Sequence, residues 1–433
     1  MSRPLPTWLS RAVGLPGATS FGRFQAWVPS AGGQEARTAA LNDESLAAAA
    51  AALDLRTGGP LPRDATVRFL AIAREAAARS LGLRPFDVQL VACCALLAGQ
   101  AVEMDTGEGK TLVGALAAAG HALSGRITHV ISVNDYLAER DAAWMRPFFE
   151  MLGVSVGWVG EHKTHDDRRR AYRNDVVYAP VSEIGFDVLR DRFAVTVDEQ
   201  VAPVFDAAIV DEADAVMIDE AMVPLVLAGT SDHDADDFTA ATRLVKSLVD
   251  GRDFAVDAEQ ATVTLTDEGL DLLEADLGGV NLYASDNIGT LTRINLALHA
   301  HALVRRDVDY LVEEGAIRLI NSGRGRVAHL QRWPDGLHAA IEAKERLAVS
   351  APGVILDTIT IQDLLLRYRT LSGMSGTVVS VAEDLLEFYK LRSGRVKRNR
   401  PNIRLDEPDR ILLTDTERLA AIVEEITARH HAG

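Results

Sequence analysis

Cysteine is scarce in this 433-residue sequence, which holds only Cys93 and Cys94. Adjacent cysteines fit the geometry of a disulfide poorly, and nothing near them has the spacing of metal ligands. This excludes a disulfide-rich secreted scaffold. We predict two reduced thiols buried in a helix, as in a cytosolic protein.

Long apolar runs are also missing. No stretch approaches the roughly 18 apolar residues of a membrane span, and the alanine-rich run at 47–52 is far too short. Residues 1–15 include basic side chains but lack the continuous apolar core of a signal peptide. We therefore expect a protein that is made in the cytosol and stays there.

Basic residues are fewer than acidic ones, 45 against 62, so the formal net charge is −17. An acidic surface repels a phosphate backbone, so no specific nucleic-acid partner is expected, although a local basic groove could offset the average. Hydrophobic residues make up 48% and charged residues 25%, which is typical of a globular protein. The length predicts two or three domains.

Between residues 86 and 227, apolar strand-like runs alternate with helical stretches, as in βαβ units on a parallel sheet. This alternation predicts a doubly wound α/β domain with ligands at the carboxyl ends of its strands. Strands are predicted at 128–133, 154–158, 176–179 and 207–210, and helices at 110–123 and 138–152.

The remaining chain is less regular. Residues 230–350 mix short strands with helices and predict an α+β insertion. The apolar run 353–361 predicts that the parallel sheet resumes there. Past a basic link at 395–400, interpreted as a solvated connection, a strand-like run at 411–415 precedes a helix at 416–430.

A glycine-containing hexapeptide, TGEGKT, stands directly before a helix-forming run. Its glycines would let backbone N–H groups approach phosphate oxygens, and the following helix offers its positive end to the same anion. The lysine would reach the β- and γ-phosphates, and the last threonine would ligate Mg²⁺. A strict P-loop has glycine where this chain has Met104, so a plain glycine-rich turn remains open. The candidate ATP or ADP ligands here are Thr106, Gly107, Glu108, Gly109, Lys110 and Thr111.

A second motif follows about a hundred residues later, where the apolar run 205–210 ends in the tetrapeptide DEAD. Carboxylates at the end of a buried strand are costly unless something compensates them, and Mg²⁺ is the obvious candidate. Asp211 would hold the metal, through water, and Glu212 would orient and deprotonate the attacking water. Alone the tetrapeptide could be a solvated acidic turn, but its pairing with the hexapeptide points to a nucleotide site.

Gln89 lies shortly before the hexapeptide. A glutamine amide donates and accepts at once, which matches the edge of adenine. Phe86 could pack on the same ring. A surface glutamine in a helix is the alternative interpretation.

Several longer sequence motifs occur in the same order along the chain as in one protein family. They are RPFDVQL at 84–90, EMDTGEGKT at 103–111, NDYLA at 134–138 with RD at 140–141, GFD at 185–187 with LRD at 189–191, VDEADAVMIDEAMVPLVLAG at 210–229, RWPDGLH at 332–338, IEAK at 341–344, ITIQ at 359–362, LSGMSGT at 371–377 and NRP at 399–401. With these strings the chain resembles the SecA family of protein-export ATPases along almost its whole length. Asp105, Met222 and Val223 depart from the family pattern. With these departures the chain resembles the accessory, second-copy members of the family from actinobacteria.

The resemblance implies a RecA-like, parallel-sheet nucleotide-binding domain of the DEAD-box motor type with an inserted α+β preprotein-binding domain. The implied domains are an amino-terminal arm with helices at 1–80, a first nucleotide-binding domain at 81–225 plus 360–395, the insertion at 226–359, and the start of a truncated second nucleotide-binding domain at 396–433. The segment 372–377 would relay the state of the γ-phosphate to the insertion.

The resemblance also implies a function. ATP hydrolysis, with Lys110, Asp211 and Glu212 as catalytic residues, would drive export of unfolded preproteins through a SecYEG-type channel. The resemblance implies a cytoplasmic protein, peripheral at the inner face of the cell membrane, and leaves a homodimer open. Because a second motor domain supplies arginines in such enzymes, we expect this chain to bind MgATP or ADP but to hydrolyse ATP weakly alone.

Two alternatives remain. A DEAD-box RNA helicase shares the tetrapeptide, but the acidic charge and the large insertion after it disfavour that interpretation. A nucleotide-regulated polypeptide-binding module would hold ATP without turnover. Loss of activity in Glu212→Gln would favour turnover, and binding without basal hydrolysis would favour the module.

Overall fold

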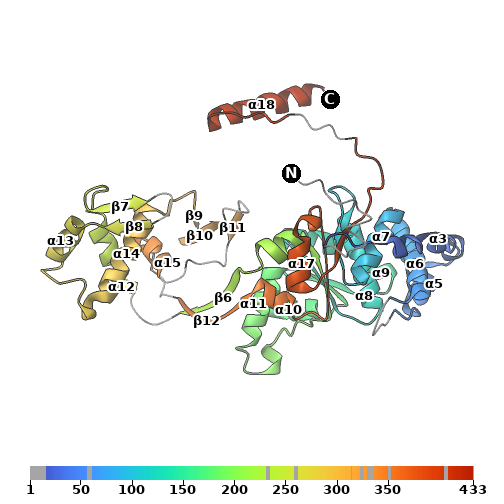
Figure 1. The fold of residues 1–433 in the computed structure, drawn as a ribbon. Coiled ribbons are helices and arrows are strands. Elements are labelled where there is room, and N and C mark those ends of the chain that lie inside the picture. The colour runs from blue at the N-terminus through green and yellow to red at the C-terminus, as the bar shows by residue number, and fades with distance from the viewer. Residues whose placement is uncertain are drawn as a thin grey trace. The chain divides into compact units, whose positions relative to one another are not determined.

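The computed structural model describes residues 16–55, 61–230, 235–257, 262–313, 315–321, 326–328, 333, 336–349, 353–403 and 408–432 (Figure 1). Contacts within the chain define two compact units. The first contains Met1–Ser124, Met151–Gly153 and Ser372–Gly433, and the second contains Gly125–Glu150 and Val154–Leu371. Among the described helices, none combines the length and apolar content of a membrane span. The predicted domain boundaries stay a prediction.

The central sheet has seven strands in the order β14-β1-β13-β5-β2-β4-β3. The strand pairs within each unit are parallel, which confirms the predicted fold class. All residues of β2 and β4 are buried, as expected for apolar runs covered on both faces. The strands are β1 (Ala101–Glu103), β2 (Thr128–Ser132), β3 (Val156–Trp158), β4 (Val176–Pro180), β5 (Ala207–Asp211), β13 (Thr370–Ser375) and β14 (Ser393–Arg395).

The first unit is rich in helices. They are α2 (Gly22–Gln25), α3 (Val28–Gly32), α4 (Glu35–Ala39), α5 (Asp43–Ala51), α6 (Arg63–Leu81), α7 (Asp87–Leu97), α8 (Lys110–Leu123), the 3₁₀ helix η4 (Val378–Val381), α17 (Ala382–Tyr389) and α18 (Asp415–Ala432). Helix α7 is buried almost throughout and contains Cys93 and Cys94, both free and fully buried. This confirms the prediction of two thiols in a helix. Burial raises the pKa of Cys94 to about 12, so its thiol stays protonated at neutral pH.

One buried arginine ties the amino-terminal helices together. Arg74 in α6 donates to Glu35 in α4 over 2.8 Å and to Asp87 in α7 over 2.6 Å. Arg84 also donates to Glu35, over 2.6 Å. The hydrogen bonds from Arg84 and then Arg74 hold the pKa of Glu35 below its usual value. The helix packing therefore depends in part on the charge of this carboxylate.

Within the second unit, α9 (Asp135–Met151), α10 (His165–Tyr172), α11 (Val181–Asp191), η1 (Val197–Glu199) and α16 (Ile361–Leu365) accompany β2 to β5. Strand β6 (Pro224–Thr230) pairs antiparallel with β12 (Gly353–Thr360) in a separate two-stranded ribbon. The prediction that the parallel sheet resumes at 353–361 is therefore wrong. This run forms one strand of the stem that leads to and from the insertion.

The insertion between β6 and β12 is α+β, as predicted. Its elements are α12 (Ala235–Val245), β7 (Phe254–Asp257), β8 (Thr262–Leu265), α13 (Asp267–Asp276), η3 (Ser285–Asn287), α14 (Ile288–Ala302), β9 (Tyr310–Glu313), β10 (Ala316–Asn321), β11 (Arg326–Ala328) and α15 (Leu337–Lys344). Two clusters of buried apolar side chains form its core, and Trp333 packs against the one around Tyr310. Residues 332, 334 and 335 of the RWPDGLH string lie outside the described residues.

The strand-like run 411–415 forms no strand. Ile411 is 89% exposed and Leu413 94% exposed, so neither side chain packs against a sheet. The strand prediction is wrong here because an apolar run becomes a strand only when a neighbouring strand satisfies its backbone. The final helix, predicted at 416–430, is confirmed as α18.

Candidate nucleotide site

The phosphate-loop hexapeptide connects β1 to the first turn of α8. Gly107 and Gly109 both have left-handed backbone conformations, with φ of 87° and 81°. Residues that carry a Cβ adopt this conformation only at a cost in free energy. Gly109 caps the amino end of α8, and Lys110 and Thr111 are the first two residues of that helix. The loop thus presents the N–H groups of a helix start where an anion would bind.

Gln89 holds this loop against α7. Its side chain is 5% exposed, accepts from the Phe86 N–H over 2.8 Å and donates to the Glu108 carbonyl over 2.9 Å. A Cβ on Gly109 would lie 2.5 Å from Gln89 Nε2, so a side chain there would displace the Gln89 amide from the loop. The structure places Phe86, 48% exposed, at the start of α7. Contact of Phe86 and Gln89 with adenine stays a prediction.

The basic link after β14 lies on the phosphate loop. Arg398 donates to the Asp105 carboxylate, and the Asn399 N–H donates to Glu108 over 3.1 Å. The hydrogen bond from Arg398, with the nearby charges of Arg395 and Lys110, holds the pKa of Asp105 below its usual value. Residues 397–400 are exposed, as expected of a solvated connection, but the link also has a specific contact, because the Arg398 guanidinium neutralises the acidic residue that departs from the family pattern.

A third segment reaches the same loop. The Ser375 carbonyl in β13 accepts from the Met104 N–H over 3.0 Å, and Ser375 Oγ lies 3.3 Å from Thr377 Oγ1. A Cβ added to Gly376 would lie 3.8 Å from Thr106 Oγ1. The segment 372–377 therefore borders the phosphate loop, which places it where it could respond to a bound phosphate. Its relay role stays a prediction.

The acidic motif ends β5 in the second unit. Four buried strand residues precede Asp211, whose Oδ1 accepts from the Glu212 N–H over 3.1 Å. Glu212 has a left-handed backbone, φ 48°, although it carries a side chain. A π-helix, η2 (Ala215–Asp219), follows two residues later. Left-handed non-glycine residues and π-turns are both enriched at functional sites, so the local backbone marks this carboxylate pair independently of the motif.

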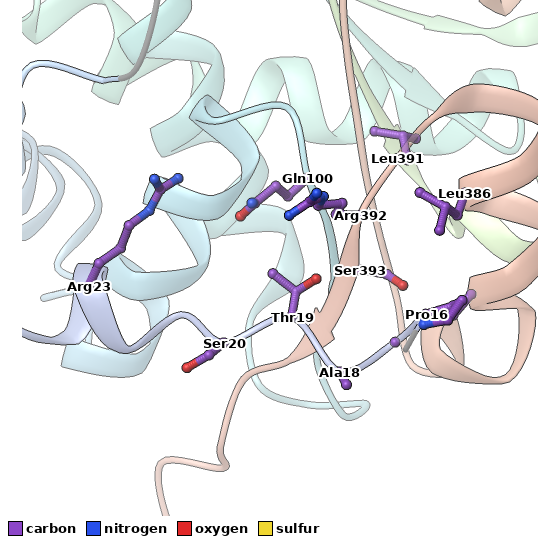
Figure 2. A pocket seen from close by; sticks show the side chains of 12 residues that line it. Pro16, Ala18, Thr19, Ser20, Arg23, Gln100, Leu386, Leu391, Arg392 and Ser393 are labelled. Atoms are coloured by element: carbon purple, nitrogen blue, oxygen red, sulfur yellow. The ribbon is translucent and has the colours of Figure 1, made fainter. Parts of the chain in front are cut away.

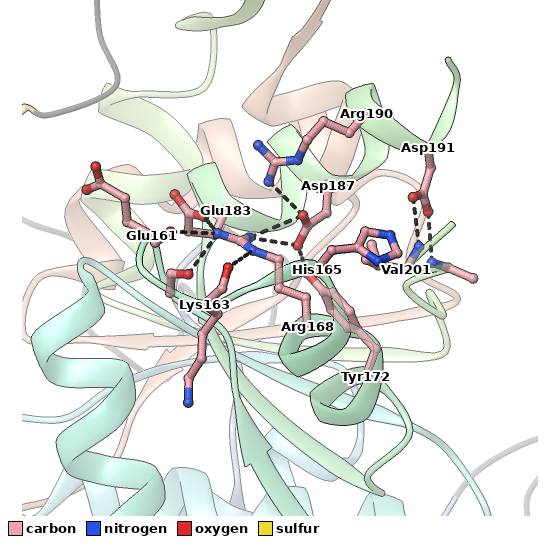
Figure 3. Close-up of polar contacts among 12 residues, drawn as sticks. Glu161, Lys163, His165, Arg168, Tyr172, Glu183, Asp187, Arg190, Asp191 and Val201 are labelled. Atoms are coloured by element: carbon pink, nitrogen blue, oxygen red, sulfur yellow. Dashed lines mark hydrogen bonds and ion pairs between the residues drawn. The ribbon is translucent and has the colours of Figure 1, made fainter. Parts of the chain in front are cut away.

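A buried charge network, which sequence analysis missed, supports the second unit (Figure 3). Arg168 of α10 donates to Glu183 over 2.6 Å and to both oxygens of Asp187 over 3.0–3.1 Å, on α11. Its guanidinium also donates to the carbonyls of Gly160, Glu161 and Lys163. Burial raises the pKa of Glu183 even though Arg168 opposes it. The GFD string, which contains Asp187, thus has a structural role in fixing α11.

Helix α11 also contacts the stem of the insertion, through Gly185 and through Arg192 at its carboxyl end. A Cβ on Gly185 would lie 2.2 Å from Leu225 Cδ1 of β6, so helix and stem meet at the glycine of the GFD string. Arg192, directly after α11, donates to Asp357 of β12 over 2.5 Å. Asp191 accepts from the Val201 and Ala202 N–H groups, each over 2.8 Å, and so fixes the loop that leads to β5 (Figure 3). Both stem strands are held by one helix.

Comparison with known proteins gives a consistent family. The family described as the SecA DEAD-like domain matches residues 9–386. Three proteins named Protein translocase subunit SecA 2 are similar. That of Mycobacterium sp. (strain KMS) is 53% identical over 95% of this chain and 53% of its own length, and that of Thermobifida fusca (strain YX) is 50% identical over 98% and 55%. The protein of Mycobacterium bovis (strain BCG / Pasteur 1173P2) is 49% identical over 98% and 53%. The chain spans about half the length of these relatives.

Proposed function

The chain belongs to the SecA family, and from that premise we propose that it binds and hydrolyses ATP as the motor portion of a protein translocase. The observation that carries this proposal is the phosphate loop itself. Two left-handed glycines and a helix start are held in place by Gln89 from one side and by the 372–377 segment from the other. Such a loop has few uses other than enclosing phosphate groups.

Each residue has a distinct task in this proposal. Lys110 neutralises charge on the β- and γ-phosphates, and the N–H groups of Gly107 and of residues 109–111 donate to their oxygens, while the Glu108 N–H donates to the Asp105 carbonyl. Glu212 orients the attacking water and accepts its proton. The left-handed backbone of Glu212 sets the direction of its side chain before the substrate arrives, which favours a preorganised base.

The donor set also suits magnesium. Thr111 offers a hydroxyl and Asp211 a carboxylate, and Mg²⁺ prefers such hard oxygen ligands, keeping several waters of its own. In this role the ion would neutralise phosphate charge. The predicted cofactors, ATP or ADP with Mg²⁺, therefore fit the residues present.

Polypeptide export is the second half of the proposal. We infer that α11 transmits changes near the acidic motif to the insertion, because its Arg192 and Gly185 hold both strands of the stem. The insertion would bind an unfolded preprotein, at the inner face of the cell membrane and beside a SecYEG-type channel. A second copy of the chain is a further proposed partner, which the molecular mass in solution tests.

The direct test is nucleotide binding and turnover by this chain. Isothermal titration with MgATP should give saturable binding, weakened at least about tenfold in Lys110→Ala because charge-assisted hydrogen bonds are lost. Single-turnover hydrolysis should disappear in Glu212→Gln while binding persists. Lys163→Ala, a lysine outside both motifs, is the matched control and should change neither quantity.

Two results would redirect the proposal. Binding that is abolished by Lys110→Ala, without any turnover in the parent chain, would favour a nucleotide-regulated polypeptide-binding module. Binding that survives Lys110→Ala would show that the phosphate loop is not the nucleotide site, and the motor assignment would fail.

A further inference from the structure

A cavity of about 420 Å³ lies in the first unit, beside the starts of β1 and β14 (Figure 2). Gln100, which lines it, directly precedes β1, and Ser393, which also lines it, begins β14. The phosphate loop follows the opposite end of β1. The cavity is therefore separated from that loop by the length of the strand, and none of its lining residues belongs to the nucleotide motifs.

The wall of this cavity is built by a chain crossing. The Thr19 N–H donates to the Ser393 carbonyl over 3.0 Å, which fastens residues 17–20 to β14. A Cβ on Gly394 would lie only 2.4 Å from the Thr19 carbonyl oxygen. Only glycine at position 394 permits this close approach of the two segments. The cavity between them therefore depends on a residue that the sequence supplies at this position.

Charge and polarity divide the lining into two parts. Arg23 and Arg392 contribute guanidinium groups, and no acidic side chain is among the lining residues. Leu386 and Leu391 contribute an aliphatic wall. In a protein of net charge −17, a pocket with two cations and no anion indicates a ligand that is itself an anion and has an apolar part.

Two buried polar atoms beside the cavity limit which ligands would fit it. Ser393 is 1% exposed, yet its Oγ has no hydrogen-bond partner among the described residues, and the same is true of the enclosed Gln100 Oε1. Buried polar groups without partners are rare because each loses its hydration without compensation. In this conformation protein atoms enclose both groups, so a ligand reaches the Gln100 oxygen only when that side chain turns toward the cavity. The oxygen can only accept, so the ligand would then offer it an N–H or O–H donor.

We propose that this cavity binds the carboxylate end of an N-acylated aliphatic amino acid. The carboxylate would pair with Arg392 and Arg23, the amide N–H would donate to Gln100 Oε1, and the aliphatic side chain would lie against Leu386 and Leu391. A phosphate group fits less well, since an acceptor oxygen and an apolar wall would oppose it. The same chemistry is supplied by the carboxyl terminus of a peptide and by a free N-acyl amino acid.

The first measurement is isothermal titration of the full chain with N-acetyl-L-leucine and with N-acetyl-L-leucinamide. The acid should bind saturably, with a dissociation constant of roughly 1 mM, as expected for a ligand of this size. The amide, which lacks only the negative charge, should bind at least about tenfold more weakly. Neither titration needs nucleotide, so the result is independent of the proposed motor function.

Variants locate the binding. Arg392→Gln should weaken the acid about tenfold, whereas Arg400→Gln, which removes the same charge outside the cavity, should leave binding unchanged. An unchanged melting temperature would show that Arg392→Gln stays folded. Absence of saturable binding, equal binding of acid and amide, or unaltered binding in Arg392→Gln would each overturn the proposal.

A further titration distinguishes the sources. A peptide that ends in leucine with a free carboxylate should bind more tightly than N-acetyl-L-leucine if peptides are the natural ligand, and its carboxyl-amidated form should not bind. If the peptide binds no better than the small acid, a free N-acyl amino acid is the ligand. Either result supports the site, provided that Arg392→Gln weakens the binding of the ligand concerned.

Discussion

The contact of Arg398 with Asp105 predicts how tightly this chain holds nucleotide. Asp105 places a carboxylate beside a loop that would bind a polyanion, and Arg398 neutralises it. Arg398→Ala would leave that carboxylate unpaired and facing the phosphates. We expect weaker nucleotide binding from electrostatic repulsion, without loss of the fold, because the ion pair is partly exposed and contributes little to stability.

The size of the effect follows from the position of Asp105, two residues before Gly107. Two residues span about 7 Å of extended chain. Two unit charges about 7 Å apart repel by about 0.6 kcal/mol in water and by about 2.4 kcal/mol at the effective dielectric constant of a protein surface. Nucleotide affinity should therefore fall about 3- to 60-fold, and less at high salt because the interaction is screened.

The assay is a titration of the chain with MgADP, which avoids turnover. Arg400→Ala removes the same charge two residues away and is the matched control. In the double variant Asp105→Asn with Arg398→Ala, affinity should return to near the parent value, since no unpaired carboxylate remains. If the double variant binds as weakly as Arg398→Ala alone, Arg398 acts on the nucleotide directly and the neutralisation argument is refuted.

Two further predictions concern stability. Arg168→Ala should lower the free energy of unfolding by about 3–5 kcal/mol in urea titrations, because it removes the arginine partner of buried Glu183 and leaves buried Asp187 with only Arg190 and Tyr172. Arg170→Ala, which breaks an exposed pair, should cost less than about 1 kcal/mol, and equal losses would contradict the role of burial. The pKa of Glu35 is lowered in the folded chain, so its contribution is present above its ordinary value of 4.5 and is lost as the pH falls below that value. Urea titrations across this range should show a shallower decline in Glu35→Gln, and identical pH profiles would count against the linkage.

Local sequence signals predicted much of the fold. Helix α8 begins and ends at the predicted residues, Lys110 and Leu123, because a glycine start and an apolar stripe define it locally. The apolar run at 353–361 was assigned to the wrong sheet, because such a run indicates a strand but not which strand pairs with it. Its pairing with β6 is decided by residues more than a hundred positions earlier in the chain.

The residues of the candidate site also fall into two groups, those that the sequence predicts and those that it does not. The glycines of the phosphate loop and the carboxylates after β5 are recognisable because their chemistry depends on neighbours in sequence. Arg398 was missed because its partner, Asp105, is almost three hundred residues away, and only the fold brings the two together. The acidic departure at position 105 was the available signal, since a carboxylate beside a phosphate loop calls for a compensating cation. Arg168 gave no such signal, because arginine in a charged helix is usually solvated.

The crossing of residues 17–20 over β14 has a consequence for solubility. Strand β14 stands at the end of the strand order, and an open edge of a sheet is a template for pairing with the edge of another molecule. The Thr19 N–H occupies the Ser393 carbonyl, and the close approach at Gly394 leaves no room there for a foreign strand. The fold therefore protects this edge with its own chain, which limits edge-to-edge aggregation at high concentration.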